Sequence, residues 1–100
     1  MKPILFHPEA EAELDAAVAY YEAQRPGLGL DFKSEVEEAL ITIQQNPQLF
    51  QRHKDTNWRG RVLGRFPYTI FYLERDNDLW IGAVAHQKRR PGYWEGRKSE

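Results

Sequence analysis

The sequence contains no cysteine and no long hydrophobic run. Without cysteine the chain has no disulfide framework, no thiolate metal ligand and no cysteine nucleophile, which suits a reducing compartment. The longest apolar run spans the seven residues 79–85, whereas a membrane helix needs roughly 20. The first residues do not resemble a secretion signal. We therefore expect a cytoplasmic protein that makes no contact with a membrane.

Other chemical signatures are missing as well. The three histidines, His7, His53 and His86, are too widely dispersed to give the spacing of metal ligands. Neither serine, Ser34 or Ser99, follows a strand in the way that a hydrolase nucleophile does. The glycine-rich segment lacks the preceding strand that dinucleotide binding requires. The sequence therefore predicts no metal and no cofactor.

The charges are unevenly distributed, although the formal net charge is only −1. Residues 1–50 include three basic and nine acidic residues, and residues 51–100 include eleven basic and six acidic ones. A basic half on a nearly neutral protein is typical of a local patch that meets phosphate or an acidic partner. Chance segregation of solvated charges is the alternative.

The hydrophobic periodicity predicts a single α+β domain over residues 1–100. A short apolar run at the N-terminus predicts a strand, and apolar residues at helical spacing predict a helix over 8–24. A turn over 25–29 leads to a second helix that ends at Asn46-Pro47. Runs rich in β-branched and aromatic residues then predict strands at 59–63, 68–73 and 79–85.

These elements pack most economically as two layers. We expect an N-terminal strand and an antiparallel two-helix hairpin packed on a twisted antiparallel β-sheet of three to four strands. The other face of the sheet is expected to stay partly open. Residues 87–100, which are basic and aromatic, are expected to form a flexible tail.

Basic residues in and after the predicted strands form a candidate binding patch. Guanidinium groups bind phosphate oxygens in pairs, and interleaved aromatic rings offer faces on which bases stack. The candidate residues for binding a target or a phosphate are Arg59, Arg89, Arg90 and Trp94. The alternative is that these arginines pair with acidic residues of a protein partner.

A second set has the residue types of a metal-independent ribonuclease. That chemistry needs a base for the ribose 2′-hydroxyl, a donor for the leaving oxygen and cations for the phosphorane. Only if the protein is a ribonuclease, the candidate catalytic residues are Arg61, Arg65, His86, Lys88 and Tyr93. A structural bond from a strand-end histidine to the backbone is the alternative role of His86.

Several short strings occur in a characteristic order along nearly the whole chain. They are His7-Pro8-Glu9-Ala10-Glu11, Tyr20-Tyr21-Glu22, Pro26-Gly27-Leu28-Gly29 with Phe32, Asn46-Pro47, Arg65-Phe66-Pro67-Tyr68 with Tyr72, Ala83-Val84-Ala85-His86, Arg89-Arg90-Pro91 and Tyr93-Trp94. In this order they resemble the RelE/ParE superfamily of bacterial type II toxins, which includes plasmid stabilization proteins. The resemblance implies the helical hairpin on a sheet, and an antitoxin that wraps and masks the toxin.

The superfamily divides by target. RelE-like members cut messenger RNA at the ribosome with basic residues on the sheet, whereas ParE-like members lack that set and inhibit DNA gyrase. In the ribonuclease branch an arginine commonly follows the tyrosine that aligns with Tyr68, but this chain has Thr69. The basic pair of the preceding strand falls on Gly60 and Val62, although a shift of one residue brings in Arg61.

Lys88, Tyr93 and Trp94 fit the C-terminal part of the ribonuclease pattern, so the set is present only in part. The resemblance therefore favours a ParE-like toxin that inhibits gyrase and arrests growth. The alternatives are a RelE-like, ribosome-dependent mRNA endoribonuclease and a non-toxic protein-interaction domain. In each case we predict a partner with an acidic or amphipathic segment that lies over the apolar stripe of the hairpin or over the open sheet face.

Overall fold

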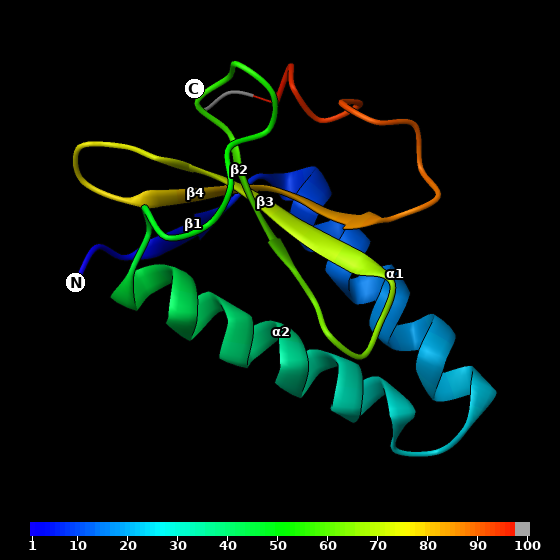
Figure 1. Ribbon diagram of the computed structural model, residues 1–100. Helices are drawn as coiled ribbons and strands as arrows, with labels where there is room; N and C mark the ends of the chain where they lie inside the picture. The colour runs from blue at the N-terminus through cyan, green and yellow to red at the C-terminus, as the bar shows by residue number, and fades with distance from the viewer. Residues whose placement is uncertain (98–100) are drawn as a thin grey trace.

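The computed structural model describes residues 1–97, which form two helices and four strands. In chain order these are β1 (Ile4–Phe6), α1 (Pro8–Gln24), α2 (Leu28–Gln45), β2 (Arg59–Val62), β3 (Tyr68–Glu74) and β4 (Leu79–His86). The helices lie together on one side of the sheet (Figure 1). The predicted α+β fold class is confirmed.

The start of α1 follows from its first residues. The Nδ1 atom of His7 accepts a hydrogen bond from the backbone N–H of Glu9 at 3.0 Å, which caps the helix. Pro8 occupies the first turn, where its missing N–H costs nothing. Glu9 and Glu11 also lie in the first turn, where the helix dipole favours carboxylates. The helix therefore spans the predicted residues.

The second helix begins at Leu28, so Gly29 is a helical residue. The sequence had predicted it as part of the turn. The Glu22 carboxylate accepts hydrogen bonds from the N–H groups of Gly27 at 2.9 Å and Gly29 at 3.0 Å. A Cβ on Gly29 would lie 2.6 Å from the carbonyl oxygen of Val18. Glycine is needed here for the close approach of the two helices.

The strand order in the sheet is β1-β4-β3-β2. β3 pairs antiparallel with β2 and β4, as predicted, whereas β1 pairs parallel with β4. The sheet is therefore mixed. The helices intervene between β1 and the other strands, so no tight hairpin turn forces β1 to be antiparallel to its neighbour.

The main core lies between the helices and the sheet. The stripe of α2 that the sequence predicted packs against the sheet through the fully buried side chains of Phe32, Val36 and Ile43. The sheet contributes Ile70, Tyr72, Leu79, Ile81 and Val84 to the same cluster. Burial of each large side chain of this kind stabilises the fold by about 1.5–3 kcal/mol.

The opposite face of the sheet, here called the outer face, is also covered. Residues 51–58 and 87–97 lie on this side, away from the helices (Figure 1). They bring Trp58 and Trp94 into a second buried cluster with small residues of β4. Part of the outer face is therefore covered by these two segments, and residues 98–100 of the predicted tail lie outside the described residues.

A bulge in β4 accommodates Trp58. The pairing of β3 with β4 shifts register between Phe71 and Tyr72, so Gly82 is the extra residue on β4. A Cβ on Gly82 would lie 2.3 Å from two carbon atoms of the Trp58 ring. A glycine in a bulged strand therefore lets the indole lie directly against the backbone.

Candidate functional site

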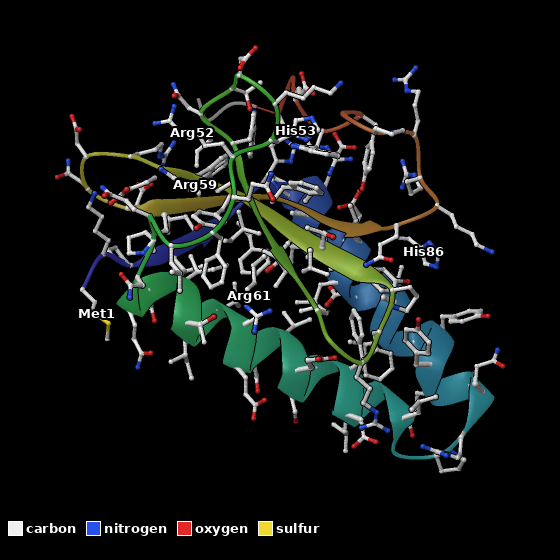
Figure 2. The ribbon with its side chains drawn as sticks, viewed as in Figure 1. Met1, Arg52, His53, Arg59, Arg61 and His86 are labelled. Atoms are coloured by element: carbon white, nitrogen blue, oxygen red, sulfur yellow. The ribbon has the colours of Figure 1, made fainter. Side chains whose placement is uncertain are left out.

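The two arginines of β2 point toward the helix side of the sheet. Arg59 Nη1 donates a hydrogen bond to the carbonyl of Phe50 at 2.8 Å, and Arg61 Nε donates to Thr42 Oγ1 at 3.2 Å. Figure 2 shows Arg61 beside α2. These arginines tie the edge strand to the end of α2 and to the segment that follows it.

Tyr68 and Tyr72 of β3 belong to the core between the helices and the sheet and have structural roles. The hydroxyl of Tyr72 donates to the carbonyl of Pro47 at 2.5 Å. Burial raises the pKa of Tyr72 to about 12, and the nearby Arg59 charge offsets only part of this rise. Burial and then the neighbouring Tyr21 raise the pKa of Tyr68 to about 12. Both phenols therefore stay protonated near neutral pH, which makes them poor general bases.

Arg65 lies in the turn between β2 and β3. Its Nη2 atom is 3.3 Å from Asp31 Oδ2, in an exposed ion pair that contributes little to stability. The backbone N–H groups of Gly64 and Arg65 both donate to Glu35 Oε2 at 3.0 Å. The position of this turn is therefore set by a carboxylate of α2.

His86 ends β4. It makes a hydrogen bond with the backbone, which is the structural role given above as the alternative to a catalytic one. Its Nδ1 atom accepts a hydrogen bond from the backbone N–H of Lys88 at 3.0 Å. The His86 ring also lines a hollow of about 260 Å³ between α1 and β4, together with Glu13 and Arg89. None of the other four candidate ribonuclease residues lines this hollow, but His86 and Tyr93 both line a second hollow of about 170 Å³ on the outer face.

Glu13 of α1 is the centre of a polar cluster that the sequence analysis missed. Its carboxylate accepts hydrogen bonds from the Tyr93 hydroxyl at 2.8 Å, from Arg97 Nη1 at 3.0 Å and from the Val84 N–H at 3.0 Å. Arg97 also donates to the Gly82 carbonyl at 3.1 Å. The side chains of Glu13 and Arg97 are only 15% and 12% exposed. This cluster holds the C-terminal segment on β4.

The aromatic residues proposed for base stacking are already covered. Trp94 is 2% exposed and stacks on Phe71 with ring centroids 3.6 Å apart. The guanidinium groups of Arg89 and Arg97 lie 3.9 and 5.0 Å from the centre of the Tyr93 ring. Burial and then the Glu13 hydrogen bond raise the pKa of Tyr93 above its ordinary value. Tyr93 is therefore a fixed hydrogen-bond donor.

His53 links the two segments that cover the outer face. Its Nε2 atom lies 2.8 Å from Glu95 Oε2, and its ring packs on Trp94 with centroids 4.9 Å apart. In the sequence, His53 is only one of three histidines too far apart to share a metal ion. The contact joins residues 42 positions apart in the chain, and nothing in the local pattern reveals it.

Three of the candidate ribonuclease residues are therefore held by separate neighbours. Arg61 bonds α2, Tyr93 bonds Glu13 of α1, and Arg65 lies in a turn beside Asp31. In the basic half of the chain, four exposed cations have no ion pair or side-chain hydrogen bond with the described residues. These are Arg52, Lys54, Lys88 and Arg90.

Two further observations concern residues 1–97. No group of three or more histidine, aspartate or glutamate side chains in this part of the chain is placed to hold a metal ion. No helix formed by these residues is long and apolar enough to cross a membrane.

Comparison with known proteins agrees with this fold. The family described as the ParE toxin of the type II toxin-antitoxin system parDE matches residues 4–91. A solved structure from the chromosomal ParDE TA system of P. aeruginosa is similar with a TM-score of 0.76 and 21% sequence identity. The alignment covers 86% of this chain and 96% of that chain. Comparison with curated proteins found no significant match.

The fold is that of a small α+β protein with a helical hairpin on one face of a mixed sheet. The family match spans most of the chain, and this chain belongs to the ParE toxin family of type II toxin-antitoxin systems.

Proposed function

We propose that this toxin arrests growth by inhibiting DNA gyrase in the cytoplasm and that a cognate antitoxin neutralises it. Family membership supports the proposal, because the ParE branch of the superfamily is the one whose members act on gyrase. On this account the toxin acts by binding and performs no covalent chemistry of its own.

One observation carries the choice of gyrase over messenger RNA. Arg61 bonds α2 and Arg65 lies in the β2–β3 turn, and neither lines the hollow of the outer face that His86 and Tyr93 share. General acid–base catalysis requires these groups within hydrogen-bond reach of one substrate. The separation of the two arginines from His86 and Tyr93 supports an inhibitor that works through its surface.

The antitoxin contact is proposed for the helical hairpin. The stripe of α2 that was predicted to receive a partner is buried against the sheet, so it is not available. Large apolar side chains do remain exposed on the hairpin: Tyr20 is 58%, Leu30 is 66% and Ile41 is 50% exposed. An amphipathic segment of the antitoxin would cover such residues.

The test is induced expression in a bacterium that lacks the antitoxin, with growth, cell length and transcript integrity scored together. The proposal predicts growth arrest, filamentous cells and intact transcripts. Growth arrest with rapid transcript cleavage would replace gyrase by messenger RNA as the target. Normal growth would indicate a non-toxic interaction domain.

Co-expression with the antitoxin tests the second part. We expect co-purification of the wild type, and its loss when Leu30→Glu and Ile41→Glu are combined. Retention of the antitoxin by this variant would contradict the proposed contact on the hairpin. Circular dichroism of the variant checks that it remains folded.

A further inference from the structure

A groove crosses the outer face of the sheet. Two hollows of about 330 and 170 Å³ share Thr69 and Phe71 of β3 as a common floor. Residues of the 51–54 segment line the first hollow, and residues of the C-terminal segment line the second. Gly60 helps to keep the groove open, since a Cβ there would lie 3.0 Å from the Phe71 ring. We call the two hollows together the outer groove.

The outer groove is lined by cations and by no carboxylate of the described residues. Arg52 and Lys54 line one hollow and have no ion pair with the described residues, and Arg89, whose Nη1 lies 3.8 Å from Glu13 Oε2, lines the other. Figure 2 shows Arg52 and His53 on the side of the sheet away from α2, whereas Arg61 faces α2. A concentration of one sign of charge on a nearly neutral protein favours a ligand of the opposite sign.

A buried donor in the groove lacks a partner. The indole Nε1 of Trp94 is buried and makes no hydrogen bond with any described residue, and Trp94 lines the second hollow. Buried polar groups in native proteins are rarely left without a partner, and an indole N–H can only donate. The hydroxyl-bearing Thr69 lies on the floor with 9% exposure. The lining of the groove therefore includes one buried N–H donor without a partner beside its cations.

The aromatic packing distinguishes a peptide from a nucleic acid. Single-stranded nucleic acids bind through aromatic rings whose faces are free for base stacking. In this groove Trp94 and Phe71 are stacked on each other, and Tyr93 lies against two guanidinium groups. The carboxylates of a peptide need only cations and N–H or O–H donors, which remain.

We propose that the outer groove binds an acidic, extended segment of the protein that this toxin inhibits. This inference rests on the proposed function, because it assigns the target to one surface of the toxin. The exposed apolar residues proposed for the antitoxin lie on the helices, on the other side of the molecule. The small volume of the groove suits a short segment of a target recognised locally.

The experiment uses the purified full chain and two charge-matched double variants. The first, Arg52→Glu with Lys54→Glu, reverses two cations that line the groove. The control, Arg25→Glu with Lys33→Glu, reverses two exposed cations of the helical half. Inhibition of gyrase supercoiling is measured, and thermal unfolding confirms that each variant is folded.

We expect the groove variant to need at least about tenfold more protein for half-inhibition, and the control to stay within about twofold of the wild type. Binding of the antitoxin by the groove variant should be unchanged. Inhibition by the groove variant that equals inhibition by the wild type would overturn the inference. Loss of antitoxin binding together with full inhibition would also overturn it, because the groove would then belong to the antitoxin.

A direct binding arm separates this inference from the proposed function. A fluorescent peptide of alternating glutamate and valine and a single-stranded RNA of equal charge are titrated with the wild type and with the groove variant. The inference predicts peptide binding that falls at least about tenfold in the groove variant and is tighter than RNA binding. The inference would be contradicted, even if gyrase is inhibited, by tighter binding of the RNA than of the peptide. Equal peptide binding by the wild type and the groove variant would contradict it as well. A wild type that binds the peptide but leaves gyrase unaffected would contradict the proposed target alone.

Discussion

The two faces of the sheet are covered in different ways. The helix side is covered by two long helices whose apolar side chains join those of the sheet in a continuous core. The outer face is covered by two irregular segments, which depend on two tryptophans, a bulge at Gly82 and the polar cluster around Glu13. The first arrangement spreads its stability over many contacts, and the second concentrates it in a few.

The difference bears on function. The regular helices build the core of the fold, whereas the irregular segments carry Arg52, Lys54, Lys88 and Arg90, the cations without an ion pair among the described residues of the basic half. A surface built from loops tolerates a change of charge more easily than a packed core does. The following predictions test this contrast, from the largest expected effect to the smallest.

The largest effects should come from the aromatic anchor of each face. We expect Phe32→Ala on the helix side and Trp94→Ala on the outer face each to lower the free energy of unfolding by about 3–5 kcal/mol. Both side chains are almost fully buried. Urea unfolding measures the change. A loss below about 1 kcal/mol for Trp94→Ala would mean that the outer face is not a true core.

The bulge should be nearly as sensitive. In Gly82→Ala the new Cβ has no room beside the Trp58 ring, so we expect a loss of about 1–3 kcal/mol. Gly96→Ala is the matched control, because a Cβ at Gly96 meets nothing within 4 Å. Its stability should stay within about 1 kcal/mol of the wild type. Equal effects of the two substitutions would contradict the role of Trp58.

The polar cluster should act locally. Glu13→Gln removes the charge that Arg97 faces and should cost about 1–2 kcal/mol, since hydrogen bonds to charged groups are the stronger ones. Hydrogen exchange should become faster in residues 87–97 while the amides of α2 stay protected. Asp15→Asn, on the exposed side of α1 and beyond its first turn, is the control and should leave the stability and both exchange rates unchanged. Uniform acceleration in both regions would contradict a local clamp.

The smallest effect concerns the turn between β3 and β4. Arg75 Nη2 donates to Asp78 Oδ2 at 2.6 Å, and this hydrogen bond lowers the pKa of Asp78 below its ordinary value of 3.8. The native state then favours the ionised carboxylate. The ion pair therefore contributes fully to the free energy of unfolding above pH 3.8, and this contribution is lost as the pH falls below that value.

The corresponding measurement is urea unfolding of the wild type and Asp78→Asn as the pH is lowered from neutral. We expect the wild type to be more stable at neutral pH by less than about 1 kcal/mol, and the difference to shrink in the acid range. A difference that grows with acidification would have the wrong sign for this ion pair.

Much of the fold is visible in the sequence because its signals are local. The helical spacing that ends at Gln24, the stop at Asn46-Pro47 and the aromatic run of β3 depend on neighbours in the chain. The start of α2 is not visible in the sequence, because Gly29 is needed for contact with Val18 of the other helix and reads locally as a turn residue. The parallel pairing of β1 likewise depends on a long-range contact that periodicity does not encode.

The candidate site was harder to predict for the same reason. The sequence identified the basic half but not which arginines are consumed by internal bonds, as Arg61 is by Thr42. Trp94 was assigned to a binding surface because an aromatic residue near a chain end gives no local sign of burial. Arg52 and Lys54 give no sign of a binding role in the sequence, because the segment around them has no periodic pattern.

The most direct test of the account is a DNA supercoiling assay with purified gyrase, the purified toxin and its Arg61→Ala variant. We predict that the wild type inhibits supercoiling, that Arg61→Ala inhibits it equally when folded, and that the antitoxin reverses both effects. Unaffected supercoiling, together with cleavage of ribosome-bound messenger RNA that Arg61→Ala abolishes, would contradict the account and establish a ribonuclease.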